Sequence, residues 1–421
     1  MQIDRREIMP QVYLTHLRAG QFKTGLISAQ LVTPLSRDTA AANALLPAVL
    51  YRGTTRFPDM EQLCAQLDRM YGAEVSPTVR KRGESQCVGF VMSFVDDALV
   101  GRGERLLERG ASLLGELLLD PVTRSGRFLN EYVDGEKANL IDAIRAARND
   151  KREWAELRLM QEMCASEPYG INRWGDEDSV RSLNNRKLFE RYRDLLATSR
   201  LELLYCGAAE PAQVQEALQE SFASLPRGAV PPLCAVVRRT APAEPRLIEE
   251  TMDVGQGKLS MGFRCGSDDV PALILANLLF GGSSNSKLFM NVREKLSLCY
   301  YASSVYARAK GIITVSSGVE SRNAQRAQSE ILTQLRAVQE GQWEDWELAA
   351  ALAAARSALQ SLGDSQGALE NYYLGQNATG QFESAEELIG RLDAVTPERI
   401  RAAAESVALD TVYFLHGKED T

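Results

Sequence analysis

The sequence predicts an α+β fold made of two related units, each a mixed or antiparallel β-sheet covered by helices. Helical and strand patterns alternate along the 421 residues. The sequence contains no G-x-G-x-x-G turn, which would indicate a dinucleotide-binding parallel sheet. A proline-rich segment at 226–246 would break helices and interior strands. We therefore expect an N-terminal domain at 1–225, a linker at 226–246 and a C-terminal domain at 247–421.

Short matches between the two halves of the chain indicate duplication of a unit of about 200 residues. Residues 50–54 (Leu-Tyr-Arg-Gly-Thr) align with 279–283 (Leu-Phe-Gly-Gly-Ser), a shift of 229 positions. Residues 204–207 align with 414–417 at a shift of 210, so the second half would carry deletions. Each match is weak alone, and their constant order supports the duplication.

The elements within a unit follow from local patterns. Apolar residues between 59 and 72 recur at the spacing of a one-sided helix, which Asp59 can cap. Interleaved charged and apolar residues predict a long helical region at 126–163. Runs of β-branched and aromatic residues predict strands at 86–95 and 311–319.

Composition argues against several classes of function. With 48 basic and 56 acidic residues, the net charge is −8 and the pI is about 5.2. The chain therefore lacks the basic character of nucleic-acid binders and of proteins that bind anionic membranes. We see neither a secretory signal nor a run of 18 apolar residues, and the seven scattered cysteines fit free thiols. We expect a cytoplasmic protein.

Two familiar kinds of site are disfavoured by the residues themselves. His16 and His416 are the only histidines, at opposite ends of the chain, and no G-x-S-x-G turn accompanies them. Both are better explained as structural residues than as catalysts. The glycine-rich stretch 281–287 lacks the spacing of a phosphate-binding loop and is typical of a turn followed by a helix cap.

The segment 291–301 predicts an amphipathic helix that leads into a tyrosine-rich strand. It resembles the C-terminal domain of the insulinase/pitrilysin metallopeptidases, where an arginine and a tyrosine seven residues later orient the bound peptide. Arg293 and Tyr300 fall on those positions, and Ser297 stands where glycine is usual. The resemblance implies that Arg293 and Tyr300 bind substrate, and both side chains can donate hydrogen bonds to a peptide carbonyl or oxyanion.

The zinc motif of the same family is missing. That family carries H-x-x-E-H on an N-terminal helix, an aromatic-Lys-Gly-Thr stretch after it, and a distal glutamate. Residues 51–54 (Tyr-Arg-Gly-Thr) fit that stretch, which places Ala44 and Ala48 on the histidines and Pro47 on the base. The distal glutamate falls near Ala143. Because alanine cannot ligate zinc, we expect no metal, no cofactor and no catalytic residue in this chain.

Further stretches resemble a bacterial branch of the family associated with the 5-aminopentanol modification of elongation factor P; they are 136–137, 149–151, 168–170, 256–264, 286–295 and 310–311. In two-component family members, one chain carries H-x-x-E-H and the other the arginine and tyrosine. The resemblance thus implies a non-catalytic subunit that holds peptide substrate in a heterodimer with a zinc-bearing insulinase-like partner, for peptide or protein maturation. The alternative is a structural or adaptor protein without a role in peptide cleavage.

Overall fold

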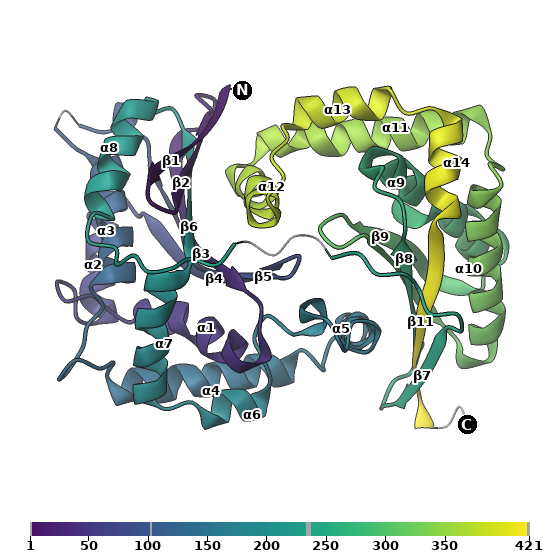
Figure 1. Ribbon diagram of the computed structural model, residues 1–421, viewed down its shortest axis with the longest axis horizontal. Coiled ribbons are helices and arrows are strands. Elements are labelled where there is room, and N and C mark those ends of the chain that lie inside the picture. Colours follow the sequence, from purple (N-terminus) through teal and green to yellow (C-terminus); the bar gives the residue numbers. More distant parts are fainter. Residues whose placement is uncertain (1, 102, 233–236, 419–421) are drawn as a thin grey trace. The chain divides into compact units, whose positions relative to one another are not determined.

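The computed structural model describes residues 2–101, 103–232 and 237–418, which form two compact units (Figure 1). Of the described residues, unit 1 contains 2–144, 171–232 and 362–382. Unit 2 contains 145–170, 237–361 and 383–418. Each unit is therefore assembled from both halves of the chain. The division at 226–246 that the sequence predicts stays a prediction.

Unit 1 is built on a six-stranded mixed sheet with the order β1-β2-β6-β3-β5-β4. Only β2 and β6 pair in parallel, and the other neighbours are antiparallel. The predicted strand at 86–95 is confirmed as β5. The strands are β1 (Gln2–Met9), β2 (Val12–Arg18), β3 (Thr24–Pro34), β4 (Glu74–Arg82), β5 (Ser85–Val95) and β6 (Arg200–Gly207).

Helices of the first half surround this sheet and bury a large apolar core against it. The helix predicted at 59–72 is confirmed, since the Asp59 carboxylate accepts a hydrogen bond from the Gln62 amide at its start. The helices are α1 (Arg37–Leu50), α2 (Met60–Asp68), α3 (Leu106–Leu119), α4 (Asn130–Ala146), α6 (Glu177–Ser182), α7 (Asn185–Thr198) and α8 (Pro211–Ser221).

Unit 2 is built on a five-stranded sheet with the order β7-β11-β8-β10-β9. Apart from β1, the strands of unit 1 follow the same order, and the parallel pair β7–β11 corresponds to β2–β6. This shared topology agrees with the duplication that the sequence predicts. The strands are β7 (Arg246–Thr251), β8 (Gly257–Cys265), β9 (Cys299–Ala307), β10 (Ile312–Val319) and β11 (Val407–His416).

The helices of unit 2 include two π-helices, η3 and η4, which lie on either side of the glycine- and serine-rich stretch. Aliphatic side chains from these helices and from the sheet form its core. The remaining elements are α9 (Val270–Asn277), η3 (Leu278–Gly282), η4 (Leu288–Lys295), α10 (Ala324–Gln339), α11 (Asp345–Gln360), α13 (Ala385–Asp393) and α14 (Pro397–Glu405).

Each unit also contains one helix from the other half of the chain. In unit 1, α12 (Gln366–Thr379) packs on β3 and β6, where Glu370 accepts hydrogen bonds from Ser28 (2.7 Å) and Arg80 (2.6 Å). In unit 2, α5 (Lys151–Met163) packs on β8 and β11. Gly262 of β8 faces this helix, and a Cβ there would lie 2.4 Å from the Met163 sulfur, so the methionine side chain would have to shift.

The helical region predicted at 126–163 is interrupted in the structure. Helix α4 ends at Ala146, and α5 begins at Lys151, where the Asp150 carboxylate accepts hydrogen bonds from the next amides. Two separate helices therefore replace a continuous one, and the chain passes from unit 1 to unit 2 at 144–145. The capping potential of Asp150 was the sequence signal for this break.

A buried cluster of charges anchors the segment that follows α5 to the sheet of unit 2. The Glu167 carboxylate accepts hydrogen bonds or ion pairs from Arg264 (2.6 Å) and Lys310 (2.6 Å). Arg264 also contacts Asp410 (2.9 Å), which pairs with Arg246 (2.7 Å). Burial by itself would raise the pKa of Glu167 and of Asp410. Hydrogen bonds outweigh burial and lower both pKa values; they come from Arg264 and Lys310 at Glu167, and from the Thr411 hydroxyl, Arg246 and Arg264 at Asp410.

The cysteines that the structure describes are free thiols, as the sequence predicts. Five of the six described cysteines are buried free thiols, whereas Cys64 is exposed; Cys234 lies outside the described residues. Within 2–101, 103–232 and 237–418, we find no helix with the length and apolar character needed to cross a membrane.

The lowered pKa values predict acid sensitivity of unit 2. Above the ordinary carboxyl pKa, Glu167 and Asp410 are charged in both folded and unfolded chains, and their full contribution to stability is present. As the pH falls below about 5, the unfolded chain takes up protons first and that contribution is progressively lost. Urea denaturation between pH 7 and pH 3.5 should therefore show a falling free energy of unfolding.

Glu167→Gln should lower the free energy of unfolding at pH 7 by about 3–5 kcal/mol, because the buried Lys310 would lose its carboxylate and Arg264 would keep only Asp410. It should also make the pH dependence shallower. Glu405→Gln is the matched control, since its ion pair with Arg401 is exposed and should be worth less than about 1 kcal/mol. Equal effects of the two substitutions would contradict the anchoring role of Glu167.

Candidate peptide-binding site

Arg293 and Tyr300 line one hollow in unit 2, as the resemblance requires of two residues that act together. The hollow has a volume of about 430 Å³, and its lining residues are Arg293, Glu294, Ser297, Leu298, Cys299, Tyr300, Glu320 and Asn323. We refer to it as the Arg293–Tyr300 hollow. Arg293 comes from η4, Tyr300 from the start of β9, and Glu320 and Asn323 from the segment after β10. The hollow thus gathers two hydrogen-bond donors beside two carboxylates.

The Arg293 side chain is held by its neighbours on η4. Its guanidinium lies 4.7 Å from the centre of the Phe289 ring and 3.4 Å from the Glu294 carboxylate. The side chain is still 41% exposed, so a ligand can reach it. At the helix start, the largely buried Lys287 pairs with Glu347 (3.1 Å), which fixes η4 to α11. A π-helix of this length is rare, and such geometry is frequent at functional sites.

Tyr300 projects from a β-bulge at the beginning of β9. Cys299 and Tyr301 pair with the neighbouring residues Val319 and Gly318 of β10, so Tyr300 is the extra residue. The Ser317 hydroxyl donates to the Tyr301 carbonyl (2.9 Å) beside this irregularity. A bulge turns a side chain away from its regular direction, and the Tyr300 side chain is 64% exposed. Its hydroxyl is therefore available to a ligand.

Ser297 explains why the turn between Arg293 and Tyr300 favours glycine. Its φ angle is +48°, in the left-handed region that costs residues with a Cβ about 1–2 kcal/mol. This conformation lets the Leu298 amide turn back and donate to the Val292 carbonyl (3.1 Å), which ends η4. The substitution by serine therefore adds strain without removing the turn that sets the spacing of the arginine and tyrosine.

Cys299 lies in the same hollow but is a poor nucleophile. Burial raises the pKa of its thiol, and the opposing effects of Ser317 and Arg293 are smaller. The thiol therefore stays protonated at neutral pH, whereas the thiolate is the reactive form.

The positions that align with the zinc motif lie on α1 and are filled by small or apolar residues. Ala44 and Pro47 are buried, and Ala48 is partly buried. The preceding Asn43 is committed to structure, since its amide donates to Gln86 (2.9 Å) and accepts from Arg191 (2.7 Å). Ala143, the position predicted for the distal glutamate, lies on α4. In the described part of the chain, no group of three or more His, Cys, Asp or Glu side chains could hold a metal ion.

The two histidines are separate buried residues of different units. His16 on β2 lies 3.0 Å from the Ala209 carbonyl oxygen and stacks on Tyr205. Burial lowers the pKa of His16, although the contact with Ala209 opposes this effect. His416 ends β11 and lies 3.0 Å from the Gly417 carbonyl oxygen. Both contacts agree with structural roles.

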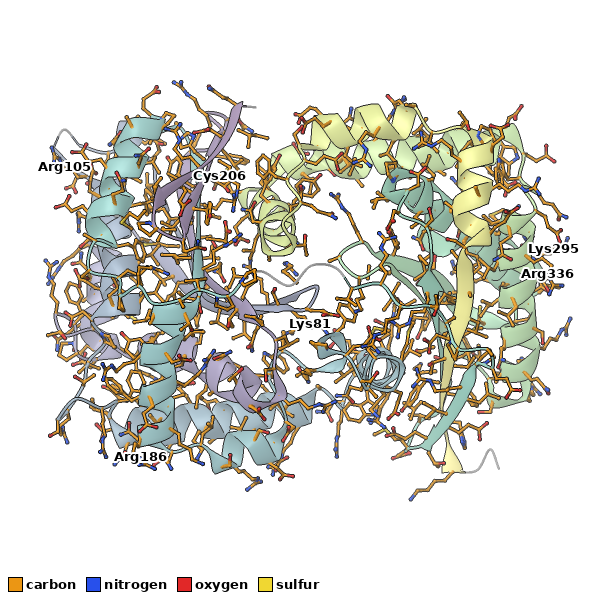
Figure 2. The ribbon with its side chains drawn as sticks, viewed as in Figure 1. Lys81, Arg105, Arg186, Cys206, Lys295 and Arg336 are labelled. Carbon is orange, nitrogen blue, oxygen red and sulfur yellow. The ribbon has the colours of Figure 1, made fainter. Side chains whose placement is uncertain are left out.

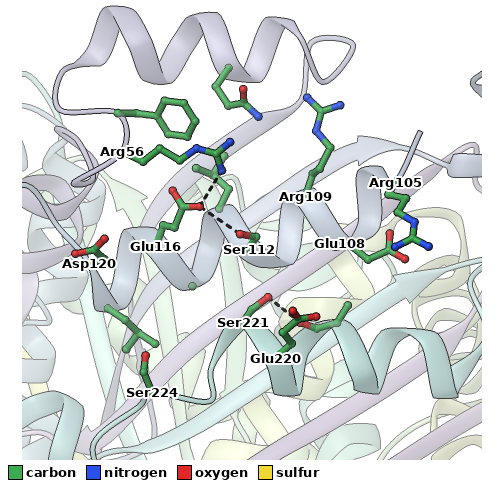
Figure 3. Close-up of a pocket in the computed structure, with 16 residues that line it drawn as sticks. Arg56, Arg105, Glu108, Arg109, Ser112, Glu116, Asp120, Glu220, Ser221 and Ser224 are labelled. Carbon is green, nitrogen blue, oxygen red and sulfur yellow. Dashed lines mark hydrogen bonds and ion pairs between the residues drawn. The ribbon is translucent and has the colours of Figure 1, made fainter. Parts of the chain in front are cut away.

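Two larger hollows contain none of the residues singled out by sequence as substrate-binding or zinc-motif positions. One, of about 500 Å³, lies in unit 1 beside α3 and α8, where Glu116 accepts hydrogen bonds from Arg56 (3.4 Å) and Ser112 (3.2 Å) (Figure 3). The other, of about 550 Å³, lies between η4 and α10 in unit 2, and Lys295 and Arg336 line it (Figure 2). Their mixed charges do not define a particular ligand.

Sequence reasoning missed Glu320 and Asn323, the residues that complete the Arg293–Tyr300 hollow. They follow β10 and reach the hollow because β10 pairs antiparallel with β9, which brings the end of one strand to the beginning of the other. Once both strands are assigned, this pairing could have indicated that residues after 319 lie near Tyr300. No local motif marks either residue.

The chain combines two α/β units with an arginine and a tyrosine at the spacing of the insulinase/pitrilysin family, and it lacks that family's zinc motif. These features define an inactive homologue of a metallopeptidase. Residues 182–355 match the family model described as "Peptidase M16 inactive domain". The Bacillus subtilis protein named "Probable inactive metalloprotease YmfF" is 35% identical over 411 residues, which cover 96% of this chain and 95% of that protein. The chain therefore belongs to the M16 peptidase family, the family of insulinase and pitrilysin, as an inactive homologue.

Solved structures agree with this assignment. A conserved protein from Enterococcus faecalis V583 is similar with a TM-score of 0.88 and 25% identity, over 99% of both chains. The structure titled "peptidase M16 inactive domain" from Pseudomonas fluorescens has a TM-score of 0.77 and 14% identity, also over 99% of both chains. The predicted fold of two α/β units is thereby confirmed.

Ser297→Gly should stabilise the protein, since glycine adopts a φ angle of +48° without the Cβ penalty. We expect a gain of about 0.5–1 kcal/mol in the free energy of unfolding, because greater flexibility of the unfolded chain offsets part of the relief. Ser329→Gly, in the exposed face of α10, should instead lower stability by about 0.5 kcal/mol. The denaturant midpoints of the two variants test this prediction. A loss of stability in Ser297→Gly would contradict the backbone strain assigned to Ser297.

Proposed function

We propose that this chain is the non-catalytic subunit of a two-component M16 peptidase. It holds a peptide substrate at the Arg293–Tyr300 hollow beside a partner that bears H-x-x-E-H. The observation that carries the proposal is the combination of an intact arginine–tyrosine hollow with alanine and proline at the zinc-motif positions. A guanidinium beside a phenol suits a peptide carbonyl, and the zinc-motif positions hold no side chain that could ligate zinc or act as the base.

The chemistry of the hollow supports binding better than catalysis. A guanidinium and a phenol can donate to a peptide carbonyl oxygen and keep it in one orientation. When the carbonyl is attacked, the same donors can stabilise the charge on its oxygen. The attacking water and its activation would have to come from the partner's metal site, because the Cys299 thiol stays protonated and Glu294 is paired with Arg293.

Our proposal places this activity in peptide or protein maturation. A link to elongation factor P modification rests on the sequence stretches that resemble that branch of the family, and a cytoplasmic location rests on the sequence alone. The adaptor hypothesis, in which Arg293 and Tyr300 have no role in cleavage, makes the opposite prediction for their substitution.

The decisive experiment reconstitutes the chain with an H-x-x-E-H subunit of the same organism and measures cleavage of a fluorogenic peptide. Arg293→Ala should lower kcat/KM by about 100-fold and Tyr300→Phe by about tenfold, since each removes a donor to the carbonyl oxygen. Arg401→Ala, an exposed arginine on α14, is the matched control and should leave the rate unchanged.

Assembly must be measured in parallel by analytical ultracentrifugation, because a variant that fails to pair would also lose activity. If paired Arg293→Ala and Tyr300→Phe proteins cleave at the normal rate, the hollow does not hold the substrate and the adaptor hypothesis is favoured.

A further inference from the structure

Two arginines on the sheet of unit 1 differ in whether a carboxylate neutralises them. Arg80 and Arg82 are two positions apart on β4, so both point to the face of the sheet that α12 covers. The Arg80 guanidinium contacts both carboxylate oxygens of Glu370 on α12 (2.8 and 2.6 Å). Within the described residues, no carboxylate forms an ion pair with Arg82. The sheet thus carries one neutralised arginine and one that keeps its charge.

The Arg82 side chain is half-buried and bonded to neutral groups. Its guanidinium donates to the Lys81 carbonyl (3.2 Å) and to the Asn371 side chain of α12. Its Nε atom is buried without a hydrogen-bond partner. Because a buried donor without a partner is costly, the Arg82 guanidinium would gain from a further acceptor.

The surroundings of Arg82 also favour an anion electrostatically. Burial, with repulsion from Arg80 and Arg173, lowers the pKa of Arg82, and the opposing effects of Cys87 and Glu370 are smaller. The positive charge is therefore held at a cost, and an anion beside it would offset both the burial and the repulsion.

Arg173, the other arginine near Arg82, lies on a turn that the fold holds in place. The Gln86 amide donates to the Arg173 carbonyl (2.6 Å) and to a carbonyl of α1 (3.0 Å), which ties the turn to that helix. Gly175 closes the turn with a φ angle of +70°, and a Cβ there would lie 2.9 Å from the Ala41 amide nitrogen. The Arg173 guanidinium lies 4.6 Å from the centre of the Trp174 ring, and the residue is exposed. Ligands can therefore reach it.

We propose that Arg82 and Arg173 bind a carboxylate of a peptide ligand. A guanidinium presents N–H donors in a fork that matches the two oxygens of a carboxylate, and Glu370 already contacts the neighbouring Arg80 through both of its oxygens. The inference rests on the proposed function, which makes the ligand a peptide, and adds to its substrate class an acidic side chain or a C-terminal carboxylate. With a net charge of −8 the chain as a whole repels anions, so such binding depends on these local arginines.

Three acetylated hexapeptides test the proposal by isothermal titration calorimetry on the full chain. The acidic probe is Gly-Gly-Glu-Glu-Gly-Gly with a C-terminal amide, and the neutral probe has glutamine in place of both glutamates. The third probe is the neutral sequence with a free C-terminal carboxylate. We expect the acidic probe to bind at least about tenfold more tightly than the neutral one, because hydrogen bonds to a charged acceptor are the stronger ones. Tight binding of the third probe alone would support the site and assign it to a peptide C-terminus, whereas equal affinity of all three would overturn it.

Substitutions locate the binding. Arg173→Gln and Arg82→Gln should each weaken binding of the acidic probe by about tenfold, since each removes a charged donor. Arg105→Gln is the matched control, because Arg105 is an exposed arginine of unit 1 on a different element and its loss changes the net charge equally. Equal effects of Arg173→Gln and Arg105→Gln would overturn the assignment. Arg173 is exposed, so its variant decides the test even if Arg82→Gln fails to fold.

Inorganic phosphate separates a carboxylate site from a general anion site. Arginine also binds phosphate, so phosphate that binds as tightly as the acidic probe would overturn the assignment to a peptide carboxylate. The proposed function fails separately. Normal cleavage by assembled Arg293→Ala would overturn the role of the hollow and leave selective binding of the acidic probe standing, whereas equal binding of all three probes would overturn only the site at Arg82 and Arg173.

Discussion

The ion cluster around Glu167 is the interaction on which the second unit depends. This carboxylate comes from the first half of the chain, whereas Arg264 and Lys310 belong to the second half. All three side chains are almost fully buried, and Glu167 is the carboxylate that Arg264 and Lys310 share, so its loss would leave an excess of positive charge in the core. Helix α5, which directly precedes the cluster, is thereby held on β8 and β11, the strands that support β10 and β9. The support of β9 and β10 thus depends on an ion pair between distant segments of the chain.

The helix that the resemblance aligns with the zinc motif is a regular part of the scaffold. Ala44 and Ala48 stand at the aligned histidine positions, and α1 remains continuous through Pro47. The stretch that follows keeps its tight turn, since a Cβ on Gly53 would lie 2.6 Å from the Pro58 backbone. Arg52 pairs with Glu136 on α4, so the turn is also tied to the helix that carries Ala143. The geometry of the first unit is therefore maintained by packing and ion pairs.

Much of the fold and part of the site followed from the sequence because they depend on local patterns. Apolar spacing predicted α2, and runs of β-branched and aromatic residues predicted β5 and β10. The family resemblance singled out Arg293 and Tyr300, which line one hollow. The exchange of α5 and α12 could not be foreseen, because it depends on buried contacts such as Glu167–Arg264 between residues 97 positions apart. Neither could the π-helical form of η4, since π- and α-helices bury similar apolar patterns. The place of Glu320 in the hollow could not be predicted either, because it depends on the pairing of β10 with β9.

The charges of the hollow suit the binding of a neutral group better than the stabilisation of an anion. Arg293 brings one positive charge, but Glu294 lies 3.4 Å from it and Glu320 lines the same hollow. Glu320 in turn pairs with Arg322 (2.7 Å), so the charged groups around the hollow balance and leave no net positive charge for an oxyanion. Under the proposed function, the metal of an H-x-x-E-H partner would supply that charge. A neutral peptide backbone needs only the hydrogen bonds that Arg293 and Tyr300 can donate.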